Sequence, residues 1–118
     1  MSTTANRDRW AKTDMADSVA EQRTQVLREV RQTTRAVLGS YPVKVYLFGS
    51  WAKGSPAPHS DIDVAIDPVS PLPPGTLATL RERFEESHIP YRVEVVDLAA
   101  MDRSFREAVI RQAIPWND

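Results

Sequence analysis

The sequence predicts one small domain of the α/β (α+β) class, in which helices pack on one face of a small mixed β-sheet. Three observations support this fold class. Segments with helical spacing of apolar residues alternate with short apolar runs of strand length. Proline and glycine residues separate these segments, and no internal repeat or second domain is evident. The 118 residues are enough for one domain with its own hydrophobic core.

The first helix is predicted over residues 17–38, where apolar residues recur at helical spacing. Asp17 or Ser18 could cap its start. Residues 1–15 are polar and charged, so we expect a flexible N-terminal segment before a single domain over residues 16–118. The apolar residues on one side of the helix are Val19, Val26, Leu27, Val30, Val37 and Leu38.

A row of basic residues, Arg28, Arg31 and Arg35, lies on another side of this helix. A solvated helix face is the ordinary explanation of such a row. The alternative is a docking surface for an acidic partner or for RNA. The whole chain carries 15 basic and 16 acidic residues, so direct nucleic-acid binding is not indicated by its net charge of −1.

Two strands are predicted next, separated by a turn and a loop. The apolar run at residues 43–48 predicts the first strand, and residues 61–66 predict the second. Between them we expect a turn with a short helical piece at residues 49–53. Residues 54–60 contain two prolines and should form a loop.

The C-terminal half is predicted to add two helices and a third strand. Four prolines mark residues 67–75 as an exposed loop. Helices are expected at residues 76–87 and 103–113, with a strand at residues 91–97 between them, and residues 114–116 close the chain. The side chains expected to face the core from these helices are Leu77, Leu80, Phe84, Phe105, Val109 and Ile110.

The most informative residues are a Gly-Ser turn and an aspartate pair. Gly49 and Ser50 follow the first strand, where backbone N–H groups and a hydroxyl can approach a phosphate. Asp61 and Asp63 are two positions apart, so they share one strand face at roughly 6.5 Å along the strand. This geometry suits Mg²⁺ held against nucleotide phosphates. We therefore predict a nucleotide-handling enzyme core.

Strand parity selects a third acidic residue. Glu94 alternates with the apolar residues of the third strand and shares a face with the aspartate pair. Asp97 has the opposite parity and is expected to cap the following turn. Asp102 is expected to be the N-cap of the last helix.

These motifs resemble the minimal nucleotidyltransferases of the DNA polymerase β-like nucleotidyltransferase superfamily. The resemblance covers roughly residues 40–113, and it implies the polymerase β-like nucleotidyltransferase fold. The residues that carry it are Gly49-Ser50, Gly54, Ser60-Asp61-Ile62-Asp63 and the strand at 91–98.

The resemblance implies specific roles. Gly49 and Ser50 would contact the β- and γ-phosphates of ATP, while Asp61 and Asp63 would bind Mg²⁺, with two ions expected. Glu94 takes the place of a third acid, usually Asp in the family, which completes the metal site and helps to deprotonate the attacking hydroxyl.

Three further residues near these motifs need interpretation. Lys53 could neutralise triphosphate charge as a nucleotide-binding residue, or be an ordinary surface lysine. Ser60 is assigned to the nucleotide-binding loop, where its hydroxyl could stiffen the turn by bonding to a neighbouring backbone N–H. Trp51 stands where many relatives carry Arg.

The implied activity is Mg²⁺-dependent transfer of AMP from ATP to a hydroxyl. The leading acceptor is a tyrosine of a small helical HEPN-family RNase toxin, with this chain as the antitoxin. One alternative is a catalytically weak antitoxin that neutralises the HEPN partner by contact, which Glu94 in place of Asp favours. Transfer to a small molecule ranks last, because such relatives carry an additional acceptor domain.

The composition excludes several other classes. The chain has no cysteine, so disulfide frameworks and thiolate metal sites are excluded. No apolar run reaches membrane-spanning length, and residues 1–15 lack the apolar core of a secretory signal. We therefore expect a cytoplasmic protein with no membrane partner.

Overall fold

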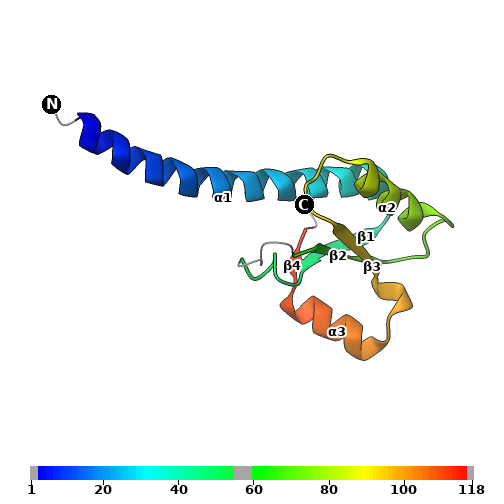
Figure 1. Ribbon diagram of the computed structural model, residues 1–118. Coiled ribbons are helices and arrows are strands. Elements are labelled where there is room, and N and C mark those ends of the chain that lie inside the picture. The colour runs from blue at the N-terminus through cyan, green and yellow to red at the C-terminus, as the bar shows by residue number, and fades with distance from the viewer. Residues whose placement is uncertain (1–2, 55–59, 117–118) are drawn as a thin grey trace.

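The computed structural model describes residues 3–54 and 60–116, with side chains described from residue 19 onward. A long first helix is followed by helices and strands in mixed order, and the last described element is a short strand (Figure 1). In chain order the elements are α1 (Thr3–Leu38), β1 (Val43–Phe48), β2 (Ile62–Pro68), α2 (Thr76–Glu86), β3 (Val93–Asp97), the 3-10 helix η1 (Leu98–Ala100), α3 (Arg103–Gln112) and β4 (Ile114–Pro115).

The four strands form one mixed sheet in the order β3-β2-β1-β4. β1 pairs antiparallel with both β2 and β4, whereas β2 and β3 are parallel. A parallel pair needs a crossover connection, and α2 supplies it between β2 and β3. The predicted α/β class with a small mixed sheet is confirmed.

α1 and α2 cover one face of the sheet, as predicted (Figure 1). Their apolar residues pack with the inward side chains of β1, β2 and β3, because alternate residues of a strand point to the same face. The fully buried members of this core include Val30, Leu38, Ile62, Val64, Ile66 and Leu80.

The third helix corrects the prediction that all helices pack on one face. α3 lies on the opposite side of the sheet (Figure 1), where Val109 joins a second core with Tyr46, Ala65 and Leu98. The reason is that Tyr46 and Ala65 make part of this second face apolar, so it also has to be covered. The rest of that face carries the acidic residues described below.

The start of α1 also differs from the prediction. The helix begins at Thr3, and neither Asp17 nor Ser18 caps it. Residues 3–16 contain no Pro or Gly, so nothing in that segment ends a helix. α1 therefore extends beyond the sheet (Figure 1), and Val19, expected on the apolar side, is 49% exposed. The flexibility of residues 1–15 and the domain boundary at residue 16 stay predictions.

Smaller differences concern the ends of elements. β2 begins at Ile62 and β3 at Val93, each later than predicted, while β4 and η1 had no counterpart in the prediction. Residues 49–53 form a hydrogen-bonded turn and no helix: the N–H groups of Ala52 and Lys53 donate to the Gly49 carbonyl at 3.1 and 3.3 Å. Most of the predicted loop at 54–60 lies outside the described residues.

The predicted caps are confirmed. The Asp97 carboxylate accepts from the Ala99 N–H at 3.0 Å at the start of η1, and the Asp102 carboxylate accepts from the Phe105 N–H at 2.8 Å at the start of α3. Phe105, however, is 43% exposed although it was expected in the core. The inner side of α3 is centred between Val109 and Ile110, so Phe105 lies at its margin.

Candidate functional site

The three acidic residues selected from the sequence lie near one another. Asp63 and Glu94 are direct neighbours in the parallel register of β2 and β3. Asp61 is exposed just before β2, where the Ile62 N–H donates to the Arg92 carbonyl at 2.9 Å. The Asp63 carboxyl is close enough to Asp61 and Glu94 to interact electrostatically with both of them. The parity argument therefore placed Glu94 on the correct face.

The electrostatics of this group favour a bound cation. Partial burial raises the pKa of Asp63, and the negative charges of Asp61 and Glu94 raise it further. In the described part of the chain no three acidic or histidine side chains already converge as a metal site. An open acidic set nevertheless fits Mg²⁺, which usually combines one or two carboxylates with substrate phosphates.

The Gly-Ser turn packs directly against the acidic group. Gly49 has a φ of 75°, and a Cβ atom built on it would overlap Asp63 Oδ2 and lie 3.3 Å from Asp63 Cγ. The register explains this approach, because Phe48, the last residue of β1, is opposite Asp63. Ser50 is half-buried and Lys53 exposed on the same turn. A turn suited to phosphate thus adjoins carboxylates suited to a cation.

Trp51 holds this arrangement together, a role that sequence reasoning did not identify. Its side chain is only 5% exposed, and its indole N–H donates to the Ser60 carbonyl at 3.2 Å. Its ring meets Tyr91 edge to face, with centroids 4.9 Å apart. Trp51 thereby connects the glycine turn to the residue before Asp61 and to the segment that enters β3. The only signal in the sequence was a large aromatic residue inside a tight turn.

Glu94 has a partner of its own. Arg92 lies two positions before Glu94 and is the residue directly before β3. Its Nη2 atom is 3.4 Å from Glu94 Oε2. Both side chains are well exposed, at 74% and 46%, so the ion pair is weak. The contact nevertheless gives the third acid a competing cation inside the protein.

A fourth carboxylate on this face is already neutralised. Asp67 lies four positions after Asp63 on the same side of β2 and is 7% exposed. Arg106 of α3 donates to it from Nη2 at 2.7 Å and from Nε at 3.4 Å. This hydrogen bond and the charge of Asp67 raise the pKa of Arg106. The pair fastens α3 to the sheet and leaves Asp67 without a role as a cation ligand.

Comparison with known proteins decides the family. Residues 32–115 match the family described as "Polymerase beta, Nucleotidyltransferase". The chain belongs to this nucleotidyltransferase family. The resemblance to the minimal nucleotidyltransferases and the polymerase β-like fold are thereby confirmed.

One similar protein is the "Probable protein adenylyltransferase MntA" of Haemophilus influenzae, which is 40% identical over 65 residues. That alignment covers 55% of this chain and 57% of the relative, so it spans little more than half of either protein. The match therefore shows that the two proteins share a similar region of 65 residues. It does not by itself show that this chain has the activity of the whole relative.

Similar solved structures come from toxin–antitoxin complexes. A mutant MntA–HpeT complex contains a chain with a TM-score of 0.60 and 20% identity, covering 76% of this chain and 70% of that one. A toxin–antitoxin structure with AMP-PNP gives a TM-score of 0.58 and 23% identity, covering 74% and 72%. At these identities the likeness shows the fold.

None of the described helices has the length and apolar character needed to span a membrane.

Proposed function

We propose that this chain is a protein adenylyltransferase that moves AMP from ATP to a hydroxyl of a partner toxin and acts as the antitoxin. The observation that carries the proposal is the close packing of the Gly49 turn on Asp63, with Asp61 and Glu94 beside it. The similarity to a probable protein adenylyltransferase and to chains of toxin–antitoxin complexes supports the reaction and the class of partner. In this proposal the protein works in the cytoplasm, where ATP is available.

The site residues divide into two groups. Gly49 and Ser50 bind the terminal phosphates through the turn at the end of β1, and Lys53 and Ser60 flank that position. Asp61, Asp63 and Glu94 would hold Mg²⁺, with two ions in the complete site; when bound, they would neutralise triphosphate charge and polarise the α-phosphate. The raised pKa of Asp63 supports this assignment, because a cation relieves the repulsion that raises it.

The reaction is a substitution at phosphorus. The acceptor oxygen forms a bond to the α-phosphorus, the bond from that phosphorus to the bridging oxygen of the β-phosphate breaks, and pyrophosphate leaves. We assign the proton of the acceptor hydroxyl to the Glu94 carboxylate, which is 46% exposed and open to an approaching side chain. Most of the rate acceleration comes from alignment and charge neutralisation.

The acceptor in this proposal is a tyrosine of a small helical HEPN-family toxin. The resemblance to the minimal nucleotidyltransferases suggests this partner, and the toxin–antitoxin character of the similar structures supports it. The acidic group lies on the sheet face that α3 covers only in part, so a protein hydroxyl can reach it.

Intact mass spectrometry tests the proposal directly. The purified chain is incubated with MgATP and the candidate toxin, and a toxin shifted by whole AMP units is expected. Asp61→Asn/Asp63→Asn should abolish the shift. The matched control Glu82→Gln/Glu86→Gln removes two exposed carboxylates from α2 and should leave it unchanged. An unchanged shift in the aspartate variant, or no shift with the natural chain, contradicts the proposal.

A second candidate function is neutralisation of the toxin by contact alone. The feature that favours it is Glu94 itself, because its side chain is one methylene longer than the Asp usual at this position, and Mg²⁺ tolerates little deviation in the placement of its ligands. In this case Asp61→Asn/Asp63→Asn should still suppress toxin activity in a growth assay. Loss of suppression while the complex persists would exclude the contact-only function.

A further inference from the structure

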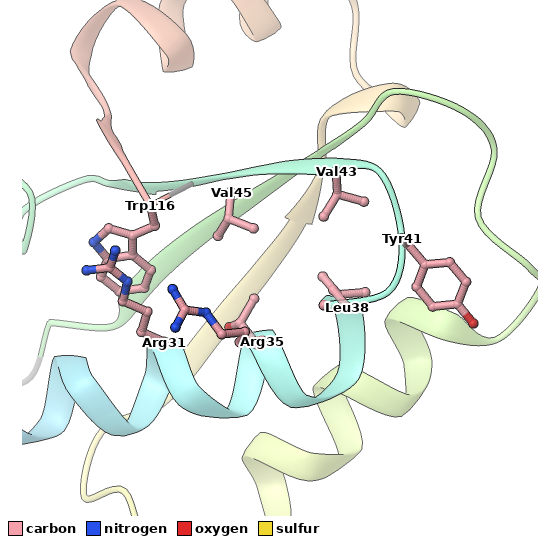
Figure 2. Close-up of a pocket in the computed structure, with 9 residues that line it drawn as sticks. Arg31, Arg35, Leu38, Tyr41, Val43, Val45 and Trp116 are labelled. Carbon is pink, nitrogen blue, oxygen red and sulfur yellow. The ribbon is translucent and has the colours of Figure 1, made fainter. Parts of the chain in front are cut away.

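Three adjoining cavities form a groove along α1. The first, of about 340 Å³, lies between the last turns of α1 and strand β1 (Figure 2). The second, of about 350 Å³, shares Arg31 and Trp116 with the first, and the third, of about 380 Å³, shares Thr24 and Arg28 with the second. We call this the α1 groove; its principal residues are Thr24, Arg28, Arg31, Arg35, Tyr41 and Trp116.

Three arginines line the α1 groove. Arg28, Arg31 and Arg35 succeed one another along the helix at spacings of three and four, so they lie on the same side. Figure 2 shows the guanidinium groups of Arg31 and Arg35 in the space between α1 and β1. Among the described residues that line the three cavities, Glu21 is the only acidic one, at the far end of the third. The arginine row is therefore the wall of a recess.

An apolar surface lies beside these charges. Trp116 is held in place because its backbone N–H donates to the Val45 carbonyl at 2.7 Å, and Arg31 lies over its ring at 5.8 Å from the centroid. Val43 and Val45 of β1 line the same recess (Figure 2). Cations next to an aromatic and aliphatic surface suit a protein segment that carries carboxylates between apolar side chains.

The charge balance of the chain favours protein over nucleic acid as the ligand. A net charge of −1 gives no long-range attraction to a polyanion, and nucleic-acid-binding domains are usually strongly basic overall. The local charge of the α1 groove is instead complementary to a short acidic segment.

The α1 groove lies on the opposite side of the sheet from the acidic site. Val45 belongs to the core beneath α1, whereas the parity of Asp63 is that of Ala65, which belongs to the core beneath α3. A segment bound in the groove therefore leaves the acidic site open.

We propose that the α1 groove binds an acidic segment of the partner toxin and holds the two proteins together independently of the chemistry at the acidic site. This inference rests on the proposed function, because it takes the occupant from the same toxin. The binding energy comes from one face of the chain and the reaction takes place on the other.

Charge reversal in the groove tests this division. The variant Arg28→Glu/Arg35→Glu changes two exposed arginines, and Arg31 is retained because it packs on Trp116. Its affinity for the candidate toxin, measured by titration calorimetry, should fall by at least about tenfold. The milder Arg28→Gln/Arg35→Gln should show a smaller loss in the same direction. The control Arg83→Glu/Arg111→Glu makes the same charge change on exposed positions of α2 and α3 and should bind normally.

Simple polymers identify the class of ligand. The isotope-labelled full chain is titrated with poly-L-glutamate and, separately, with poly-uridine, and the indole N–H resonance assigned by Trp116→Phe is followed by NMR. A shift with poly-L-glutamate that Arg28→Gln/Arg35→Gln removes supports the inference. A response to poly-uridine alone overturns it in favour of RNA.

The outcomes for groove and activity are separable. Normal toxin affinity in both groove variants overturns the inference, even when the toxin still gains AMP. No AMP gain with the natural chain contradicts the proposed function, even when the groove variants lose the toxin.

Discussion

Replacing Gly49 by alanine tests whether the glycine turn and the acidic group form one site. Gly49 has a φ of 75°, which an alanine adopts only at a cost, and the added Cβ would overlap Asp63 Oδ2. The overlapping atom is the end of a side chain, so the carboxylate of Asp63 has to swing away. Gly49→Ala is thus expected to move one predicted metal ligand without removing it.

The magnitude follows from two contributions. Forcing an alanine into the left-handed region costs about 1–2 kcal/mol. Displacing the Asp63 side chain from its preferred rotamer adds about 0.5–1.5 kcal/mol. We therefore expect a loss of roughly 1.5–3.5 kcal/mol in the free energy of unfolding. A misplacement of about 1 Å at a reacting centre can reduce the rate by about a hundredfold.

Gly75→Ala is the matched control. Gly75 has a φ of 86°, but a Cβ there would meet nothing within 4 Å. The Gly75→Ala variant should therefore lose only the backbone contribution of about 1–2 kcal/mol to the free energy of unfolding, and it should keep its activity. Urea unfolding measures the stability of both variants, and the rate of AMP transfer measures their activity. Equal transfer rates for Gly49→Ala and Gly75→Ala would refute the reasoning.

Three other residues give further predictions. Trp51→Phe removes the hydrogen bond to the Ser60 carbonyl, so it should destabilise the fold by about 1–3 kcal/mol and raise the KM for ATP; an unchanged KM would show that this bond does not position the site. Ionisation of Asp63 opposes folding because its pKa is raised, so Asp63→Asn should be more stable than the natural chain at pH 7. Urea unfolding at stepped pH should show this difference shrinking as the pH falls towards the unfolded-state pKa of about 3.9, and a difference that grows on acidification contradicts it. Arg106→Gln should destabilise more than Asp67→Asn, since only the former leaves a buried carboxylate without its cation, and thermal unfolding of the two variants makes the comparison.

The acidic group was accessible from the sequence because strand parity depends only on local geometry. Once residues 61–66 and 91–97 are taken as strands, Asp61, Asp63 and Glu94 fall on one face. The structure adds the register that makes Asp63 and Glu94 neighbours. Their catalytic roles stay predictions until the variants are measured.

The features that sequence reasoning missed depend on long-range contacts. Nothing near Trp51 in the sequence indicates that its indole reaches Ser60 and its ring Tyr91. The sequence pattern predicted that Asp67 begins a loop. Its ion pair with Arg106, 39 residues later, depends on where α3 packs against the sheet. The short strand β4 likewise exists only because the chain returns to the edge of β1.

The start of α1 was misjudged for a different reason. The polar and charged character of residues 1–15 favoured a later helix start, near Asp17 or Ser18, where the apolar spacing begins. Backbone preference alone favours continuation, since residues 3–16 contain neither Pro nor Gly, and α1 begins at Thr3. Local propensity is sufficient to account for this end of the helix.

The geometry of Glu94 also bears on whether the proposed antitoxin would act by catalysis or by contact alone. Its ion pair with Arg92 is long, at 3.4 Å, and both side chains are well exposed, so solvent screens most of its energy. A divalent cation held by Asp61, Asp63 and a triphosphate would present a larger charge to the same carboxylate. The ion pair with Arg92 is therefore too weak to prevent Glu94 from interacting with such a cation. The longer side chain of Glu94 changes where its carboxylate lies, and the Arg92 contact alone gives no reason to regard the site as inactive.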